Sequence, residues 1–256
     1  MRWLAILVAF TTQLSGFALA QPQQAPGAED HLEPDGSILG GDAFMAGYEL
    51  QVARKLKEAY GPGVVVRMVA LPSFVPEYAV GLASKAQYGK RAPYRIFALA
   101  PAASLWTYQS IAMLKNGSVR ELGNQNQSAE KAQKEEIARL ESSVPRDPDD
   151  LKVNRCEIDI NDALGNRIIE VWRKMLLRTH YPERNMMGLD GATYHFGIAA
   201  PGTGLLTGKI WSPQQDTANG TLVALADTMR AVCQKEKGAS EMQLEKLTAE
   251  LEQRLH

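Results

Sequence analysis

Apolar side chains recur three or four residues apart in several stretches of the chain, which is the spacing of one face of a helix. Such a stripe, which includes Leu50, Val52 and Leu56, predicts a helix over 46–60, and the glycines and proline at 61–63 end it. Further helices are predicted over 104–115, 128–141, 162–179, 221–235 and 241–255.

Other stretches have the composition or the alternation of strands. Three of them, 64–71, 77–84 and 94–100, follow one another with short connections, which favours antiparallel neighbours. At the start of the second half of the chain, the stretch at 155–160 predicts another strand. The alternation of Tyr194, Phe196 and Ile198 before the strand-like segment 205–211 predicts a hairpin.

These elements predict an α+β fold in which helices pack against an antiparallel sheet. The same order, helix then strands then helix, occurs twice, which suggests two helix-hairpin-helix blocks. The expected parts are a flexible leader at 21–41, a first block at 42–115, a polar insertion at 116–150, a second block at 151–236 and a C-terminal amphipathic helix at 237–256.

The C-terminal helix carries leucines along one side and begins with the capping-box pattern Ser240 to Gln243. It is too short to be stable by itself in water. We therefore expect its apolar stripe to dock, either on the rest of this chain or on a partner.

Residues 1–20 have the order of a secretory signal peptide: a basic residue, an apolar run and small residues at Ala18 and Ala20. The alternative is an uncleaved anchor, but the apolar run is much shorter than the ~20 residues that span a bilayer. The sequence thus predicts a soluble periplasmic or secreted protein, with no membrane span after signal cleavage.

Cys156 and Cys233 are the two cysteines of the chain. In an oxidising compartment such a pair is most simply interpreted as one disulfide. A catalytic thiol is the alternative, and it would need a histidine partner that the sequence does not place near either cysteine.

The charge balance, 28 basic against 29 acidic residues, does not favour nucleic acid as a partner. The glycine-rich stretch at 200–213, APGTGLLTGKIWSP, resembles a phosphate-binding loop at first sight, yet its glycine spacing is wrong and Ile210 follows Lys209. We interpret its glycines as a hairpin turn and expect no cofactor.

His180, Asp190 and His195 are the speculative catalytic residues, because they combine the side chains of an acid/base site within a short segment. With Glu183 in place of Asp190, the two histidines have the residue types of a metal site. The alternative interpretation is a polar histidine on a strand face, since His195 alternates with the inward-facing residues and points away from the core.

Glu77 and Tyr78 follow a turn stiffened by Pro72 and Pro76. A rigid turn can present side chains to a ligand, so both residues, with Asp190 and His195, are speculative binding residues. Initiation of a strand accounts for the same pattern equally well.

The segments RMVALPSFVPEYAVGL, VWRKMLLRTHYP and GLDGATYHF resemble exported proteobacterial proteins without an established activity. The resemblance implies a periplasmic setting and no catalytic residue. Our leading hypothesis is an exported binding protein without catalytic activity, with an inhibitor or immunity-like role towards a protein partner. The alternatives are a hydrolase or metal-dependent enzyme that uses the histidine segment, and a structural or assembly accessory.

Overall fold

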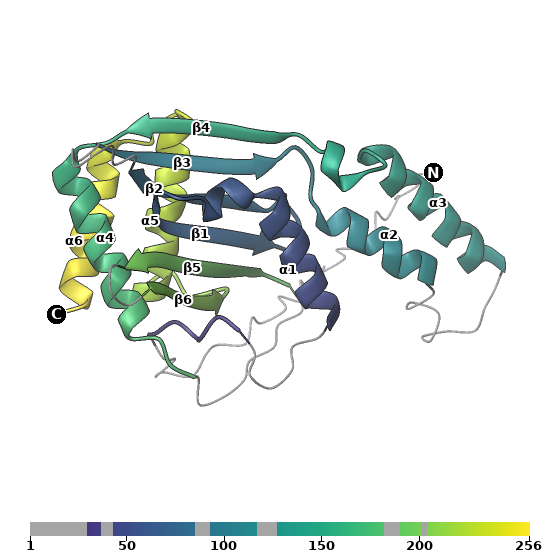
Figure 1. Ribbon diagram of the computed structural model, residues 1–256. Coiled ribbons are helices and arrows are strands. Elements are labelled where there is room, and N and C mark those ends of the chain that lie inside the picture. Colours follow the sequence, from purple (N-terminus) through teal and green to yellow (C-terminus); the bar gives the residue numbers. More distant parts are fainter. Residues whose placement is uncertain (1–29, 37–42, 85–92, 117–126, 182–189, 201–203) are drawn as a thin grey trace, which may run out of the picture.

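The computed structural model describes residues 30–36, 43–84, 93–116, 127–181, 190–200 and 204–256. Their strands form one six-stranded antiparallel sheet in the order β4-β3-β2-β1-β5-β6 (Figure 1). The strands are β1 (Val64–Pro72), β2 (Tyr78–Ser84), β3 (Tyr94–Pro101), β4 (Val153–Asp159), β5 (Ala192–Ala200) and β6 (Gly204–Trp211). The predicted α+β class and the antiparallel connections are confirmed.

Both predicted blocks contribute to this single sheet, because β1 pairs with β2 on one side and with β5 on the other. The helices are α1 (Ala43–Lys55), η1 (Lys57–Tyr60), α2 (Trp106–Asn116), α3 (Gln127–Ser143), η3 (Pro148–Asp150), α4 (Asp162–Leu177), α5 (Ala218–Cys233) and α6 (Glu241–Arg254). The helix that the sequence predicts over 46–60 is therefore two shorter elements, α1 and η1.

Two apolar clusters lie on opposite faces of the sheet. The larger cluster unites inward residues of the strands, such as Met68 and Phe196, with α4, α5 and α6. The smaller cluster places Val52 and Leu56 of the 43–60 region against Val69 and other residues of the second face. Figure 1 shows α1 in front of the sheet and α5 behind it.

The local sequence explains the helices that pack most closely. In α4 the expected stripe is buried, Trp172 at its centre included, and the Asn161 side chain caps the helix by accepting the N–H of Ala163 at 2.7 Å. In α1 the stripe is rotated from the expected one: Tyr48 is buried, whereas Leu50 is 52% exposed.

Cys156 of β4 and Cys233 of α5 form the predicted disulfide, with their Cα atoms 5.8 Å apart. It joins the edge strand β4 to the helix that packs on β2, β3 and β4. The closed loop spans 77 positions. In the chain-entropy description, a loop of this length stabilises the fold by about 4 kcal/mol.

The sequence predicts a flexible leader over 21–41, and this expectation does not hold for residues 30–36. Leu32 is fully buried, and Glu33 and Lys209 exchange two backbone hydrogen bonds of 2.8 and 2.7 Å. We call residues 30–36 the strap, because they cross the β6 edge of the sheet. The predicted signal peptide, residues 1–20, lies outside the described residues.

The apolar stripe of α6 docks on its own chain: Leu244, Leu251 and Leu255 are buried in the larger cluster with α4 and α5. The predicted capping box does not form, since Ser240 is the N-cap but its side chain makes no capping hydrogen bond. No helix in the described ranges combines the length and the apolar character that a bilayer crossing needs.

Candidate functional site

One face of the sheet changes from apolar to polar between β1 and the β6 edge. The register pairs His195 with Val69 on β1 and with Lys209 on β6, and Glu33 of the strap bridges to Lys209. Directly paired residues of antiparallel strands project to the same face. Val69 belongs to the apolar cluster beneath α1. The row of paired residues therefore runs from the buried Val69 through His195 to Lys209 at the polar edge of the sheet.

The predicted orientation of His195, away from the face that carries Phe196, is thus confirmed. Its imidazole Nδ1 lies 3.0 Å from Asp35 Oδ1 of the strap. Because an ionised carboxylate only accepts hydrogen bonds, the Nδ1–H of the imidazole donates to Asp35 in this contact. Nε2 is buried without a hydrogen-bond partner, 3.9 Å from Glu49 Oε1 of α1.

Arg67 extends this polar face on β1. Its register partner on β5 is Gly197, whose missing side chain leaves room: a Cβ there would lie 3.0 Å from the guanidinium carbon. The guanidinium lies 4.4 Å from the centre of the Tyr60 ring. Burial lowers the pKa of Arg67, and the nearby Tyr60 and Asp35 partly offset that effect.

We call Asp35, Glu49, Arg67, His195 and Lys209 the His195 cluster. It combines an imidazole oriented by a carboxylate with two cationic side chains on one sheet face. An imidazole held in this way is the arrangement of a general base. The same contacts also fasten the strap to the sheet.

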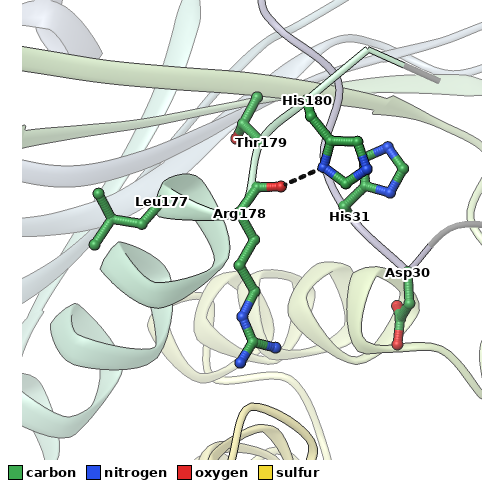
Figure 2. A pocket seen from close by; sticks show the side chains of 6 residues that line it. All are labelled: Asp30, His31, Leu177, Arg178, Thr179 and His180. Atoms are coloured by element: carbon green, nitrogen blue, oxygen red, sulfur yellow. Dashed lines mark hydrogen bonds between the residues drawn. The ribbon is translucent and has the colours of Figure 1, made fainter.

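His180 lies at a different place, past the end of α4. Its ring stacks on that of His31, with ring centres 3.3 Å apart and planes 16° apart (Figure 2), and its Nδ1 lies 2.8 Å from the carbonyl oxygen of Arg178. A shallow cavity of about 550 Å³ adjoins the stack. It is lined by Asp30, His31, Leu177, Arg178, Thr179 and His180.

The charged groups beside this cavity have partners elsewhere. The Asp30 carboxylate accepts the N–H of Asn219 at the start of α5, and the Arg178 guanidinium donates to the carbonyl of Leu255. In Figure 2 both side chains extend away from the two rings. The stacked pair therefore has no charged group converging on it among the residues drawn.

The histidine segment does not assemble as one site. His180 contacts the strap beside α4, whereas His195 contacts Asp35 on the opposite face of the sheet. Asp190 is exposed just before β5. Glu183 lies outside the described residues, and within the described ranges no group of three or more histidine, cysteine or acidic side chains is placed to hold a metal ion.

Glu77 is a buried structural carboxylate rather than a presented one, which corrects the expectation for this residue. It is fully buried and accepts hydrogen bonds from the Tyr48 hydroxyl at 2.5 Å and from the backbone N–H groups of Leu105 and Trp106 at 2.8 and 3.0 Å. Ser104 donates to the same carboxylate. It thereby holds α1 and the start of α2 on the sheet.

Tyr78 is likewise buried, on the other face, so it is not presented to a ligand either. Its hydroxyl donates to Asp227 of α5, and the Arg230 guanidinium lies 4.3 Å from the centre of its ring. Burial raises the pKa of both Tyr78 and Asp227.

The turn between β1 and β2, residues 72–76, presents different side chains from the expected ones. Phe74 is 81% exposed and Val75 is 55% exposed. We call this segment the 72–76 turn. The sequence pointed to it through Pro72 and Pro76, but the two residues that face solvent were missed, because only the tertiary packing buries Glu77.

The 72–76 turn is fixed to the start of β5. Ser73 donates from its backbone N–H and its hydroxyl to the carbonyl of Gly191, at 2.9 and 2.8 Å, and the Gly191 N–H lies 3.2 Å from the same hydroxyl. Only glycine fits at position 191: its φ is +151°, and a Cβ would lie 2.2 Å from the Ser212 hydroxyl. Asp190, exposed, precedes this contact directly.

The glycine-rich stretch at 200–213 is mainly strand. Residues from Gly204 onwards form β6, and Lys209 lies in its middle opposite His195. The backbone N–H of Lys209 bonds to Glu33, so this strand does not form a phosphate-binding loop. Residues 201–203, where the turn was expected, lie outside the described residues.

Sequence reasoning missed Asp35, Glu49, Arg67 and Lys209. Alternation along β5 and β6 puts His195 and Lys209 on one face only when the register of the two strands is known. Nothing in the sequence indicates that register. Comparison of the chain with protein-family models, with curated proteins and with solved structures found no match.

Proposed function

We propose that this chain is an exported binding protein, without catalytic activity, that recognises a protein partner through Phe74 and Val75 of the 72–76 turn. The observation that carries the proposal is the 81% exposure of Phe74 on an anchored turn. A large exposed ring is unfavourable in water, and burying such a side chain stabilises a complex by about 1.5–3 kcal/mol. Aromatic anchors contribute much of the affinity at protein interfaces.

The rigidity of the turn supports the same proposal. Pro72 and Pro76 restrict the backbone on both sides of Phe74, and Ser73 is held by three hydrogen bonds to Gly191. A backbone already held in place loses little conformational entropy on binding. The disulfide and the signal-peptide pattern support export to the periplasm or beyond. An inhibitor or immunity-like role is the form that we propose for the binding.

A photo-crosslinking amino acid at position 74, introduced in the native host, tests this function. We expect a discrete crosslinked product with one other protein. The matched control carries the same amino acid at position 242, because Met242 is 74% exposed on α6. The proposal fails if position 74 gives no product, or gives only the products that position 242 gives.

A second candidate function is hydrolysis with His195 as a general base, and the Asp35 to His195 contact of 3.0 Å favours it. The test is the hydrolysis of p-nitrophenyl acetate and p-nitrophenyl phosphate, with and without added Zn²⁺, by the wild type and by His195→Ala. The matched control is His180→Ala, which removes the other histidine of the predicted segment and keeps all five residues of the His195 cluster. Activity that persists in His195→Ala, or no activity in the wild type, rejects this candidate.

The third hypothesis, a structural or assembly accessory, depended on an apolar stripe of the C-terminal helix that was free to dock elsewhere. That stripe is buried within the chain at Leu244, Leu251 and Leu255. This burial removes the observation that favoured the accessory hypothesis.

A further inference from the structure

We infer that the partner is a folded protein with an apolar pocket that takes Phe74 and with a basic group on the rim of that pocket, which pairs with Asp190. This inference rests on the proposed function. It adds the shape and the charge of the partner's surface, and it assigns Asp190 as a residue that determines specificity.

The structure joins Asp190 to the 72–76 turn through a single contact. Gly191 follows Asp190 in sequence and Ser73 precedes Phe74, and Ser73 and Gly191 are hydrogen bonded to each other. Phe74 and Asp190 are therefore each the sequence neighbour of one member of the hydrogen-bonded pair Ser73 and Gly191. Glu77, which directly follows the 72–76 turn, is buried and hydrogen bonded within the chain, so its charge does not face a partner.

The form of the turn indicates a concave partner. Phe74 and Val75 lie at the end of the β1–β2 hairpin. The Phe74 ring is 81% exposed, so a pocket could enclose it on nearly all sides. A flat interface would bury only part of such a ring. Pocket burial with full desolvation is the setting in which one aromatic side chain contributes most to affinity.

The carboxylate of Asp190 argues against a membrane as the occupant. Bacterial and other biological membranes carry anionic lipids, which repel an exposed carboxylate. One phenylalanine and one valine also bury too little apolar area for stable anchoring, which needs a longer amphipathic helix or two acyl chains. A basic rim on a protein partner instead attracts Asp190 and steers the encounter.

The experiment uses the protein captured by the crosslinker at position 74, purified and identified, as the probe. Its binding is measured by calorimetry and by stopped-flow association at low and at physiological salt. The proteins compared are the wild type, Phe74→Ala, Asp190→Lys and the control Glu245→Lys, which changes an exposed carboxylate of α6. Phospholipid vesicles with and without phosphatidylglycerol are the second probe.

We expect Phe74→Ala to weaken binding about 30-fold or more. Asp190→Lys should slow association about tenfold at low salt, with a smaller effect at high salt, because salt screens a rim charge. Glu245→Lys should bind as the wild type does. A loss with Phe74→Ala but none with Asp190→Lys would leave the proposed function standing and overturn this inference.

Other outcomes separate the two proposals further. Wild-type affinity in Phe74→Ala overturns the proposed function, and this inference with it. Binding to vesicles that depends on Phe74 identifies a lipid surface and overturns the inference of a protein pocket. An equal effect of Asp190→Lys and Glu245→Lys indicates general charge repulsion, and it also overturns the assignment of Asp190.

Discussion

Asp35 and His195 are 160 residues apart in the sequence, yet their side chains meet at 3.0 Å across the β6 edge of the sheet. The contact exists because the strap crosses that edge, with Leu32 buried on one side and Asp35 on the other. A segment with the composition of a leader thus becomes part of the folded domain. This relationship is testable independently of any function.

We expect Asp35→Asn to destabilise the protein by about 1 kcal/mol, because the amide oxygen can still accept the hydrogen bond from His195 but the carboxylate charge that strengthens this contact is lost at a partly exposed site. Thermal unfolding measures the change. Asp159→Asn is the matched control: Asp159 pairs with Arg95 at 2.7 Å, but its side chain is 65% exposed, so we expect a smaller effect. Equal effects of the two substitutions would show that Asp35 does not fasten the strap.

Glu77→Gln should destabilise the protein by about 3 kcal/mol, since the amide replaces one acceptor oxygen by a donor and leaves buried N–H and O–H groups unpaired. Chemical denaturation gives the free energy of unfolding directly. Glu58→Gln serves as the control, because the Glu58 side chain is 54% exposed. If Glu77→Gln unfolds at the denaturant concentration of the wild type, the internal role of this carboxylate is refuted.

Asp227 makes stability depend on pH in a direction that is unusual for an aspartate. Burial raises its pKa in the folded state, more than the hydrogen bond from Tyr78 and the charge of Arg230 lower it. The folded protein therefore holds this proton more tightly than the unfolded chain does. Its ionisation destabilises the fold as the pH rises from the unfolded pKa through the raised folded pKa.

Asp227→Asn removes that ionisable group and keeps an oxygen that accepts the Tyr78 hydroxyl. We expect the variant to be more stable than the wild type at neutral pH, and the difference to disappear as the pH falls below the ordinary range of an aspartate. Melting temperatures of both proteins between pH 3 and pH 7 test the sign. A variant that is less stable at pH 7 would contradict it.

Leu251→Ala should lower the free energy of unfolding by about 2–5 kcal/mol, because this leucine is fully buried where α6 packs against its own chain. Met242→Ala, on the exposed side of the same helix, should have little effect. Denaturant unfolding compares the two. A neutral Leu251→Ala would mean that α6 does not dock on this chain in solution, and would restore the assembly hypothesis.

Local periodicity was sufficient for most elements and for the faces that several of them bury, but not for the buried face of α1. The stripe of α4 appears in the sequence and is buried in the fold, and the alternation around Phe196 placed His195 on the other face of β5. The antiparallel sheet followed from short connections, and the disulfide from Cys156 and Cys233 being the only pair.

The candidate sites could not be obtained in this way. Alternation along a strand predicts which face a side chain lies on, but not which residue of the neighbouring strand it pairs with. The row from Val69 through His195 to Lys209 therefore follows only from the register of β1, β5 and β6. Phe74 lies in the 72–76 turn and Glu77 directly follows that turn, and only the packing of α1 and α2 decides that the carboxylate is buried and the ring exposed. The sequence by itself determined the secondary structure, the fold class and the disulfide, because these depend on local spacing and on composition; the contacts between distant residues depend on how the elements pack, and the tertiary structure alone decided them.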